Sequence, residues 1–289
     1  MIPNNNLSVL PWYTSLAQQN ARKWWIQGRV YPLYAQAGFV PPFQIIVPHM
    51  AVPDIASAYL YDANTDTQTA NILSALTSSG LTAKQFAALD YDVIVFPGAF
   101  PIMARQANGR YYIRLEINSV YYYSEIYTIV NDMEPYLKIT WWDAADFTMD
   151  AGTIVYTSPA FKNILYLQSD LAKPEYTFEE DGKERDGYFF PVKLISEKKY
   201  HFSFLASEYL LDVMRLIRLS DFVEVEYRGQ KYSLDTFLIT PQWEAQGDVA
   251  VVNAEFSTAT VAKKLGVGYI RAQRGDFSDD FSNDFANQQ

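Results

Sequence analysis

The chain has 289 residues and a formal net charge of −10, and 49% of its residues are hydrophobic, 19% charged and 16% aromatic. This length suggests two domains of roughly 150 residues each, and the acidic charge argues against nucleic acid or an anionic membrane as the main partner, because both attract clustered lysine and arginine. The chain has no cysteine, which excludes disulfides and thiolate zinc sites, and it shows neither a signal-peptide pattern nor an apolar run long enough to span a membrane.

The first 53 residues contain no aspartate or glutamate, and they carry a charge of +3 that leaves −13 for the rest of the chain. Ser15, followed three residues later by Gln18, is a possible capping box, and apolar residues at helical spacing up to Gly28 predict a short helix. We interpret residues 1–42 as an N-terminal arm that lies on an acidic surface of this chain or of a neighbour. A solvated lead-in is the alternative interpretation. The candidate assembly residues of the arm are Trp12, Arg22, Lys23, Trp24, Trp25 and Arg29.

Residues 43–130 are predicted to form a β-domain. The candidate strands have the sequences "FQIIV", "AYLYD", "YDVIVF" and "GRYYIRLEI", with a turn expected at Asn118-Ser119. In the fourth strand Ile113 and Leu115 face one way, while Tyr112, Arg114 and Glu116 face the other. The tyrosine-rich end of this region resembles the last two strands of an immunoglobulin-like or fibronectin-type-III sandwich.

The stretch "SVYYYSEIYTIV" at residues 119–130 has aromatic or apolar side chains on both faces. Strand alternation assigns Tyr121, Tyr123, Tyr127 and Ile129 to one face, and Tyr122, Ile126 and Val130 to the other. A strand of this kind is buried on both faces or covered by a partner, so Tyr122 is a candidate assembly residue. Stacking on sugar rings is the competing interpretation, here and at Trp141-Trp142. Adjacent residues point to opposite faces, so only one of each such pair could join a single platform.

Residues 131–135 are interpreted as a hinge, and residues 136–265 as a second β-rich domain with one helix. A long hairpin is predicted at residues 174–206, with an acidic tip from Glu179 to Asp186. The helix is predicted at 207–218, where an apolar stripe follows Ser207. The stripe consists of Leu210, Val213, Met214 and Ile217. The predicted fold is therefore mostly β: two tandem β-sandwich (immunoglobulin-like) domains, the second with one helix, plus the arm and a C-terminal tail.

The tail, residues 266–289, is polar and low in complexity, which predicts a flexible segment. An Asp-Phe pair recurs in it every four residues. Evenly spaced phenylalanines on a polar chain could dock into a neighbour's grooves, and a solvated tail is the alternative. The candidate docking residues are Phe277, Phe281 and Phe285.

Catalytic and metal-binding patterns are weak throughout. The two histidines, His49 and His201, have no second histidine nearby, so structural roles are expected. The segment from Asp62 begins like a calcium loop but has Thr67 where glycine is needed and Leu73 where glutamate is needed, which favours an ordinary turn. We therefore predict no enzyme activity, no catalytic residues, no cofactor and no metal.

Several segments resemble an uncharacterised protein family encoded in phages and prophages of gut Bacteroidetes. They are "RKWWIQGRVYPLY", "YYSEIYTIV", "YLKITWWDAADF", "FKNILYLQSDLAKPEYTFEEDGKERDGYFFPVKLISEKKYHFSFLASEYLLDVMRLI" and "YSLDTFLITPQWEAQGDVAVVNAEFSTATV". The resemblance covers most of the chain and implies a virion component of the tail, its hub or its baseplate, made in the host cytoplasm. The implied partners are other copies of the chain and other phage tail proteins. A receptor-recognition module that binds cell-surface glycans stays open as the alternative.

Overall fold

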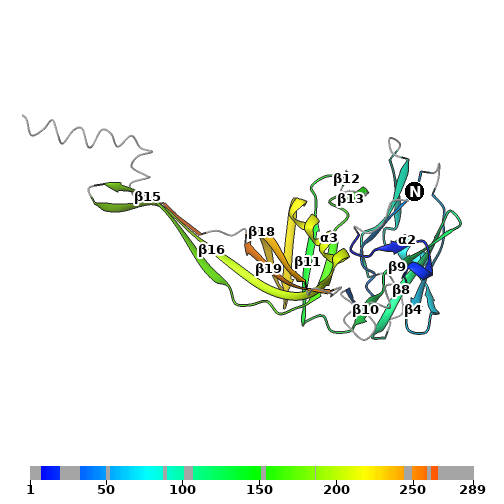
Figure 1. Cartoon of the computed structure of the whole chain (residues 1–289). Helices are drawn as coiled ribbons and strands as arrows, with labels where there is room; N and C mark the ends of the chain where they lie inside the picture. Colours follow the sequence, from blue (N-terminus) through cyan, green and yellow to red (C-terminus); the bar gives the residue numbers. More distant parts are fainter. Residues whose placement is uncertain are drawn as a thin grey trace, which may run out of the picture.

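A computed structural model describes residues 8–19, 33–49, 53–86, 90–100, 107–150, 154–185, 187–243, 249–258 and 262–265. Within these residues the chain is mostly β, as the sequence predicts. Figure 1 shows an N-terminal half and a C-terminal half side by side, with a hairpin that projects away from the C-terminal half. The predicted tail lies outside the described residues.

The N-terminal half contains a seven-stranded sheet centred on one long strand, β8. β4 pairs with one edge of β8, while β9 and β10 share the other edge. β1 then pairs antiparallel with β9, and β2 pairs parallel with β10. The strands of this sheet are β1 (Trp12–Tyr13), β2 (Tyr34–Gln36), β4 (Ile55–Asp62), β5 (Thr67–Asn71), β8 (Gly109–Ile117), β9 (Val120–Ser124) and β10 (Tyr127–Val130).

A second, three-stranded sheet covers one face of the first, so this half is a β-sandwich. It consists of β3 (Phe43–Pro48), β7 (Tyr91–Phe96) and β6 (Thr82–Gln85), in the order β3-β7-β6, and the short helix α2 (Leu73–Ser78) precedes β6. Trp12 of the first sheet packs on Phe43 of the second with ring centroids 4.8 Å apart, and Phe43 stacks on Phe96 at 5.3 Å.

Glu125 and Ile126 lie between β9 and β10 and shift the side-chain alternation of this stretch. Tyr122 faces the core between the two sheets, as do Tyr127 and Ile129, whereas Ile126 packs on the opposite face with Tyr112. The sequence prediction, which placed Tyr127 and Ile129 on the same face as Tyr121, is wrong at this point. Two consecutive residues outside the ladder reverse which side chains point inward, as in a β-bulge.

The C-terminal half is built on a single eight-stranded sheet. Its order is β14-β11-β17-β18-β19-β16-β15, with β20 also paired to β16. The strands are β11 (Tyr136–Trp142), β14 (Asn163–Gln168), β15 (Glu175–Arg185), β16 (Tyr188–Ser207), β17 (Phe222–Tyr227), β18 (Gln230–Trp243), β19 (Val249–Thr258) and β20 (Ala262–Leu265). In the described residues a helix, not a second large sheet, covers the core face, which differs from the predicted sandwich.

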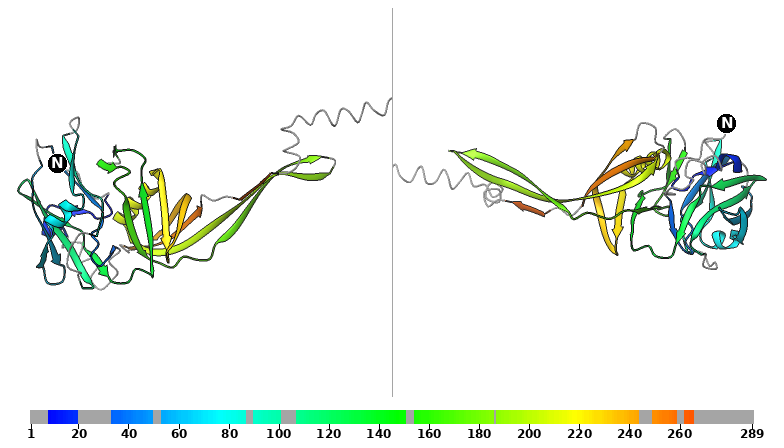
Figure 2. Two further views of the ribbon diagram at one scale, coloured as in Figure 1. Left: turned by 180° about the vertical axis from the view of Figure 1, so that it is seen from behind. Right: turned by 60° about the horizontal axis from the view of Figure 1, so that its bottom comes forward.

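That helix is α3 (Glu208–Met214), continued by a 3-10 turn at Arg215–Leu219. Figure 2 shows it lying against the sheet from two further directions. The predicted apolar stripe is confirmed, because all four of its residues are buried in the core. In the turn that extends the helix, Leu216 and Ile217 are buried and Leu219 is exposed.

Two segments join the halves into one continuous core. Val9, Leu10 and Leu33, which belong to the predicted arm, lie in the same hydrophobic cluster as Leu165 of β14. A small separate hairpin, β12 (Phe147–Asp150) with β13 (Ile154–Thr157), extends from the C-terminal half to the three-stranded sheet. There the Tyr156 amide donates to Gln44 Oε1 at 2.7 Å.

The described parts of the predicted arm, 8–19 and 33–42, are therefore part of the body. β1 and β2 complete the first sheet, and their neighbours fill the space between the halves. The predicted boundary at residue 42 and the free hinge at 131–135 do not match this arrangement. Patterns of neighbouring residues could not predict this arrangement, because the strands that pair with β1 and β2 follow about a hundred residues later in the chain.

We expect Leu210→Ala to lower the free energy of unfolding by about 2–5 kcal/mol, because it opens a cavity in a packed core. Leu210 is 0% exposed, whereas Leu219, in the adjacent turn, is 59% exposed. Leu219→Ala is the matched control and should change stability by no more than about 0.5 kcal/mol. Denaturant unfolding of both variants checks this, and equal losses would contradict the packing.

Tyr34 links the halves and should make stability fall at high pH. Its hydroxyl donates to Gln168 Oε1 at 3.1 Å, and burial, together with neighbouring Tyr136, raises the pKa of Tyr34 to about 12. An unfolded tyrosine ionises near pH 10, so the unfolded state loses this proton first. The stabilising contribution is present below about pH 10 and is lost as the pH rises towards 12. Unfolding curves of Tyr34→Phe should show a shallower loss of stability over this range than the parent; identical slopes would contradict the assignment.

Candidate assembly surfaces

The most prominent surface feature is the projecting hairpin. β15 and β16 pair from Glu175 with Lys199 to Arg185 with Tyr188, with one register shift between Asp181 and Gly182, and Gly187 turns the chain at a φ of 77°. Beyond Lys199 the same strand β16 runs on into the body, where it pairs with β19. The hairpin is therefore an extension of the body sheet and not a separate loop (Figure 1).

One face of the hairpin continues the core face of the sheet. Within the body, β16 directs Tyr200, Phe202 and Phe204 into the core. Strand alternation places Lys198 and Ser196 on that same face, and their cross-strand partners are Tyr176 and Phe178. Tyr176 is 56% exposed and Phe178 is 72% exposed. The aromatic face that α3 covers in the body thus runs outward on the hairpin, where none of the described helices covers it.

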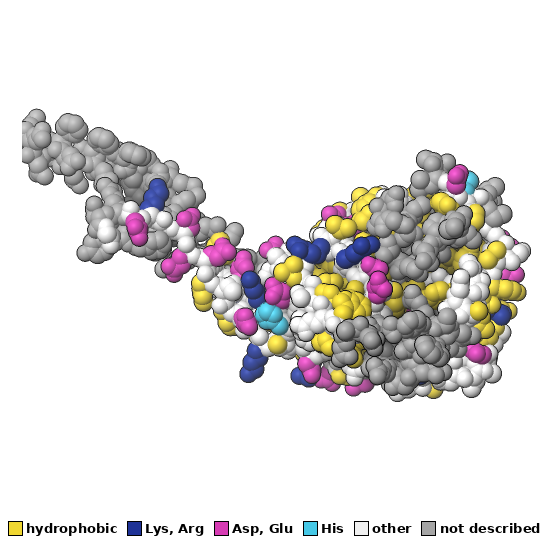
Figure 3. Space-filling model, in the orientation of Figure 1, with side chains coloured by type: hydrophobic (Ala, Val, Ile, Leu, Met, Phe, Trp, Pro, Cys, Tyr) yellow, Lys and Arg dark blue, Asp and Glu magenta, His cyan; other side chains and the backbone are white. Residues whose placement is uncertain are grey.

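Acidic side chains accompany these aromatic residues. Glu179, Glu180 and Asp181, with Ile195, line an open groove of about 340 Å³. Acidic side chains are visible along the hairpin in Figure 3. Among the described residues, no ion pair neutralises these three carboxylates. The hairpin therefore offers exposed aromatic rings and carboxylates, and the strand register places Lys193 opposite Asp181.

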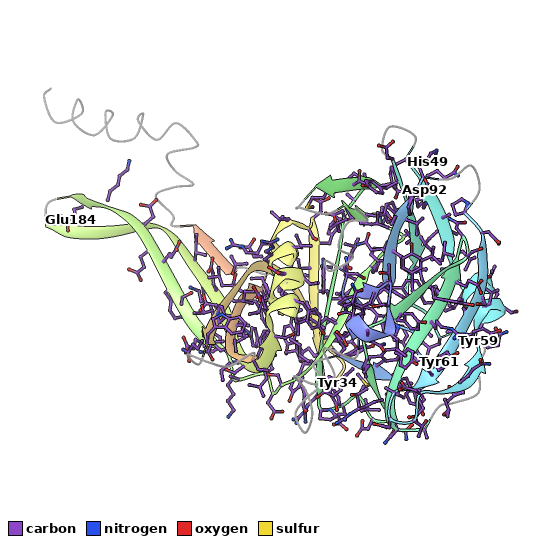
Figure 4. The ribbon with its side chains drawn as sticks, turned by 45° about the vertical axis from the view of Figure 1, so that its right-hand side comes forward. Tyr34, His49, Tyr59, Tyr61, Asp92 and Glu184 are labelled. Carbon is purple, nitrogen blue, oxygen red and sulfur yellow. The ribbon has the colours of Figure 1, made fainter. Side chains whose placement is uncertain are left out.

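A second surface lies on the outer face of the seven-stranded sheet, and we name it the tyrosine–arginine face. Its members come from β4, β8 and β9: Tyr59, Tyr61, Tyr112, Arg114, Tyr121 and Tyr123. The strand register places Arg114 directly between Tyr59 and Tyr123. Figure 4 shows Tyr59 and Tyr61 at the end of the molecule opposite the hairpin tip, which is labelled at Glu184.

Arg114 is the centre of this face. Its guanidinium carbon lies 5.4 Å from the ring centroid of Tyr59, 4.9 Å from that of Tyr61 and 5.0 Å from that of Tyr121. Such contacts are favourable because the face of an aromatic ring carries partial negative charge. Tyr121 is the most open of the three rings, with 43% of its side chain exposed.

The charge of Arg114 is not neutralised within the described part of the chain. Its Nε is buried without a hydrogen-bond acceptor, and no carboxylate there lies at ion-pair distance. Glu116, two residues further on the same face, accepts a hydrogen bond from Ser57 Oγ at 3.0 Å instead. Burial, with a smaller effect of nearby Asp66, raises the pKa of Tyr112 above the ordinary value of a tyrosine. The face can therefore bind an anionic group through Arg114 and stack a ring on Tyr121.

Trp142 forms a smaller aromatic site on β11. It stacks on Phe222 with centroids 5.4 Å apart, and Lys162 Nζ lies 4.1 Å from its ring centroid. Its neighbour Trp141 is buried in the core. The expectation that only one tryptophan of this pair could join a surface is confirmed.

The predicted assembly residues fall in two groups. Trp12 and Tyr122 are buried in the chain's own core, where strand pairing and the facing sheet cover them, so neither is available to a partner. The others lie outside the described residues: Arg22, Lys23, Trp24, Trp25, Arg29, Phe277, Phe281 and Phe285. The sequence analysis did not predict the tyrosine–arginine face. The signal for it was the alternation in β8, which places Arg114 on the side opposite the core residues.

Two polar groups that the sequence singled out have structural partners. Asp62 Oδ1 accepts from the amides of Asn64 and Thr65, an ordinary turn in place of a calcium loop. His49 Nδ1 lies 2.8 Å from an oxygen of buried Asp92. In the described ranges no cluster of three metal-binding side chains occurs. The helices described there are all too short or too polar to cross a bilayer.

Comparison with known proteins gives little. No family model and no curated protein matches the chain. A solved structure, titled as the crystal structure of Dpr2 Ig1-Ig2 in complex with DIP-Theta Ig1-Ig3, matches 82% of this chain and 94% of that chain at 8% identity, with a TM-score of 0.15. A likeness at this level carries no argument about function.

Tyr121 and Tyr122 are adjacent, but substitutions should affect them differently. Tyr122 is 1% exposed, so Tyr122→Ala should lower the free energy of unfolding by about 3–5 kcal/mol. Tyr121→Ala removes only a surface cation–π contact and should cost less than about 1 kcal/mol. Denaturant unfolding of the two variants measures the difference. A larger loss for Tyr121→Ala would contradict the assignment of the two faces.

Proposed function

We propose that the chain is a structural subunit of a bacteriophage virion, in the tail hub or baseplate, and acts by protein–protein assembly. The observation that carries assembly is the hairpin, where the core face of a sheet continues outward with Phe178 72% exposed. Leaving apolar surface in water costs about 25 cal/mol per Å², and large exposed apolar patches on soluble proteins mark interaction sites. The virion context comes from the family resemblance of the quoted segments.

The proposal includes the fold expected for such a subunit, with an immunoglobulin-like N-terminal half. Two facing sheets and a tyrosine-rich final hairpin support this half of the expectation. Tandem β-rich units suit a repeated structural protein, because each offers flat faces to its neighbours. The proposed partners are other copies of the chain and other tail proteins, and the proposed location is the tail of the particle.

A glycan-binding receptor module is the second candidate, and the tyrosine–arginine face favours it. Exposed Tyr121 could stack on a sugar ring while Arg114 donates to a carboxylate or hydroxyl of that sugar. The same residue types also dominate the energetically important centres of protein–protein interfaces. The hairpin favours assembly over glycan binding, because a glycan site on the sheet gives the hairpin no role.

The test is incorporation into particles of the phage that carries the gene. Complementation with Phe178→Ser is expected to give particles depleted in this chain by mass spectrometry, while purified Phe178→Ser melts like the parent. Leu219→Ser, at a residue that is 59% exposed but off the hairpin, is the control and should be incorporated normally. A chain that is absent from purified parental particles would refute the virion role, and normal incorporation of Phe178→Ser would refute assembly through the hairpin.

A further inference from the structure

We propose that the C-terminal segment, residues 266–289, docks on the exposed aromatic face of its own β15–β16 hairpin and covers it until a partner displaces the segment. This inference rests on the proposed function as an assembly subunit, because it adds regulation to the surface that carries that proposal. The segment itself lies outside the described residues. The support comes from the described hairpin, from the place where the described chain ends, and from the sequence that follows it.

The described chain ends on the hairpin. β20 pairs antiparallel with β16 and lies along the hairpin in Figure 2. Its register begins with Ala262 opposite Ser196, which is also the cross-strand partner of Phe178. The register ends three residues later, at Leu265. With strands about 4.8 Å apart and residues about 3.3 Å apart along each strand, Leu265 lies roughly 14 Å from the position of Phe178. The segment therefore begins beside the face that it is proposed to cover.

The segment is long enough to return to this face. Phe277, its first phenylalanine, follows 12 residues after Leu265, and a chain of that length spans up to about 40 Å when extended. A short flexible linker of this kind holds the segment near its own hairpin at an effective concentration in the millimolar range. A second copy at micromolar concentration is at a disadvantage of about a thousandfold. This difference favours the hairpin of the same chain as the docking site.

Two exposed rings and a lysine dominate the chemistry of the face. Tyr176 and Phe178 are exposed on it, and Lys198 Nζ lies 5.6 Å from the ring centroid of Tyr176. Lys198 is exposed, and no carboxylate of the described residues lies at ion-pair distance from it. Alternation places one carboxylate on this face, Glu180, and the register aligns Lys264 with it in the same row. The face thus suits a ligand that is both aromatic and acidic.

The sequence of the segment has these two properties. Residues 276–285 contain four aspartates and three phenylalanines, and neither lysine nor arginine. Because an Asp-Phe pair recurs every four residues, more than one pair can place a ring on the hairpin and a carboxylate near Lys198. Aromatic pairing and a charge-assisted hydrogen bond make such a contact favourable. Even a weak contact is populated at the millimolar effective concentration of a linked segment.

Docking of the segment would compete with assembly. The rings that it covers, Tyr176 and Phe178, are the exposed rings of the hairpin through which the proposed function joins a neighbouring subunit. A partner that binds only the uncovered face shifts the population towards the uncovered state by its own binding energy. A chain would thus be kept from joining through this face until it meets a partner that binds the face more tightly than the segment does.

Disulfide trapping tests the docking, because the chain has no cysteine of its own. Ser196→Cys, on the aromatic face, is combined with Ser278→Cys in the segment, and this first pair leaves every ring in place. Thr177→Cys with Ser278→Cys is the matched control, because Thr177 is next to Phe178 but on the opposite face of the hairpin. Under mild oxidation the first pair should form an intramolecular disulfide about tenfold faster than the control. Equal rates, or a first pair that gives only disulfide-linked dimers, would overturn the proposal.

Substitutions in the background of the first pair test which groups make the contact. Lys198→Glu should slow the disulfide to the rate of the control, and so should the triple change Phe277→Ser, Phe281→Ser and Phe285→Ser. Lys199→Glu, on the opposite face of the hairpin, should leave the rate unchanged. A disulfide rate that responds neither to Lys198→Glu nor to the triple change would show a segment that is only tethered, and it would refute the contact.

Phage particles separate this inference from the proposed function. In purified particles that carry the first pair, the disulfide should form at least about tenfold more slowly than in the free chain, because a neighbouring subunit occupies the face. An unchanged rate in particles would refute displacement of the segment and leave the virion role intact. If the chain is absent from particles, the virion role fails, and the disulfide rates of the free chain still decide whether the segment docks on the hairpin.

Discussion

The arrangement of the N-terminal half depends on a buried polar group at the break between β9 and β10. The carboxyl group of Glu125 accepts from the Tyr13 hydroxyl at 2.8 Å and from the Ile126 amide at 2.9 Å. Ser124 Oγ accepts from the Ile113 amide at 2.8 Å. Buried polar groups without such partners cost several kcal/mol, roughly 2–7 for a neutral group. Tyr13 supplies one of the hydrogen bonds to this buried carboxyl group, and the contact holds the N-terminal segment against the sheet.

Both candidate surfaces follow from that constraint. The interruption turns Tyr127 and Ile129 into the core while Tyr121 and Tyr123 stay outside, so the outer face of the sheet keeps its rings around Arg114. The anchored N-terminal segment then fills the space between the halves and merges their cores. A joint with a shared core resists bending, since interiors are close-packed. The hairpin is thus held at a defined distance and direction from the tyrosine–arginine face, which suits the proposed role in assembly.

The sequence predicted what depends on neighbouring residues. The turn at Asn118-Ser119, where both residues have positive φ, and the helix stripe around Leu210 came from local patterns and are confirmed. The edge pairing of Trp12 with Ser124 could not be predicted in this way, because no periodicity reports a partner so distant in the chain. The same limit applies to the candidate surfaces. Alternation showed that Arg114 faces outward, but only the register of β4 and β9 shows that rings from three strands surround it.

Phe178 and its acidic neighbours combine two requirements that otherwise conflict. An exposed aromatic strand invites unspecific pairing, and charged residues beside it are the usual protection against aggregation. On this hairpin charged residues of both signs lie beside the rings, since the strand register places Lys193 opposite Asp181. These charges allow aromatic side chains to stay exposed on a single chain without unspecific strand pairing.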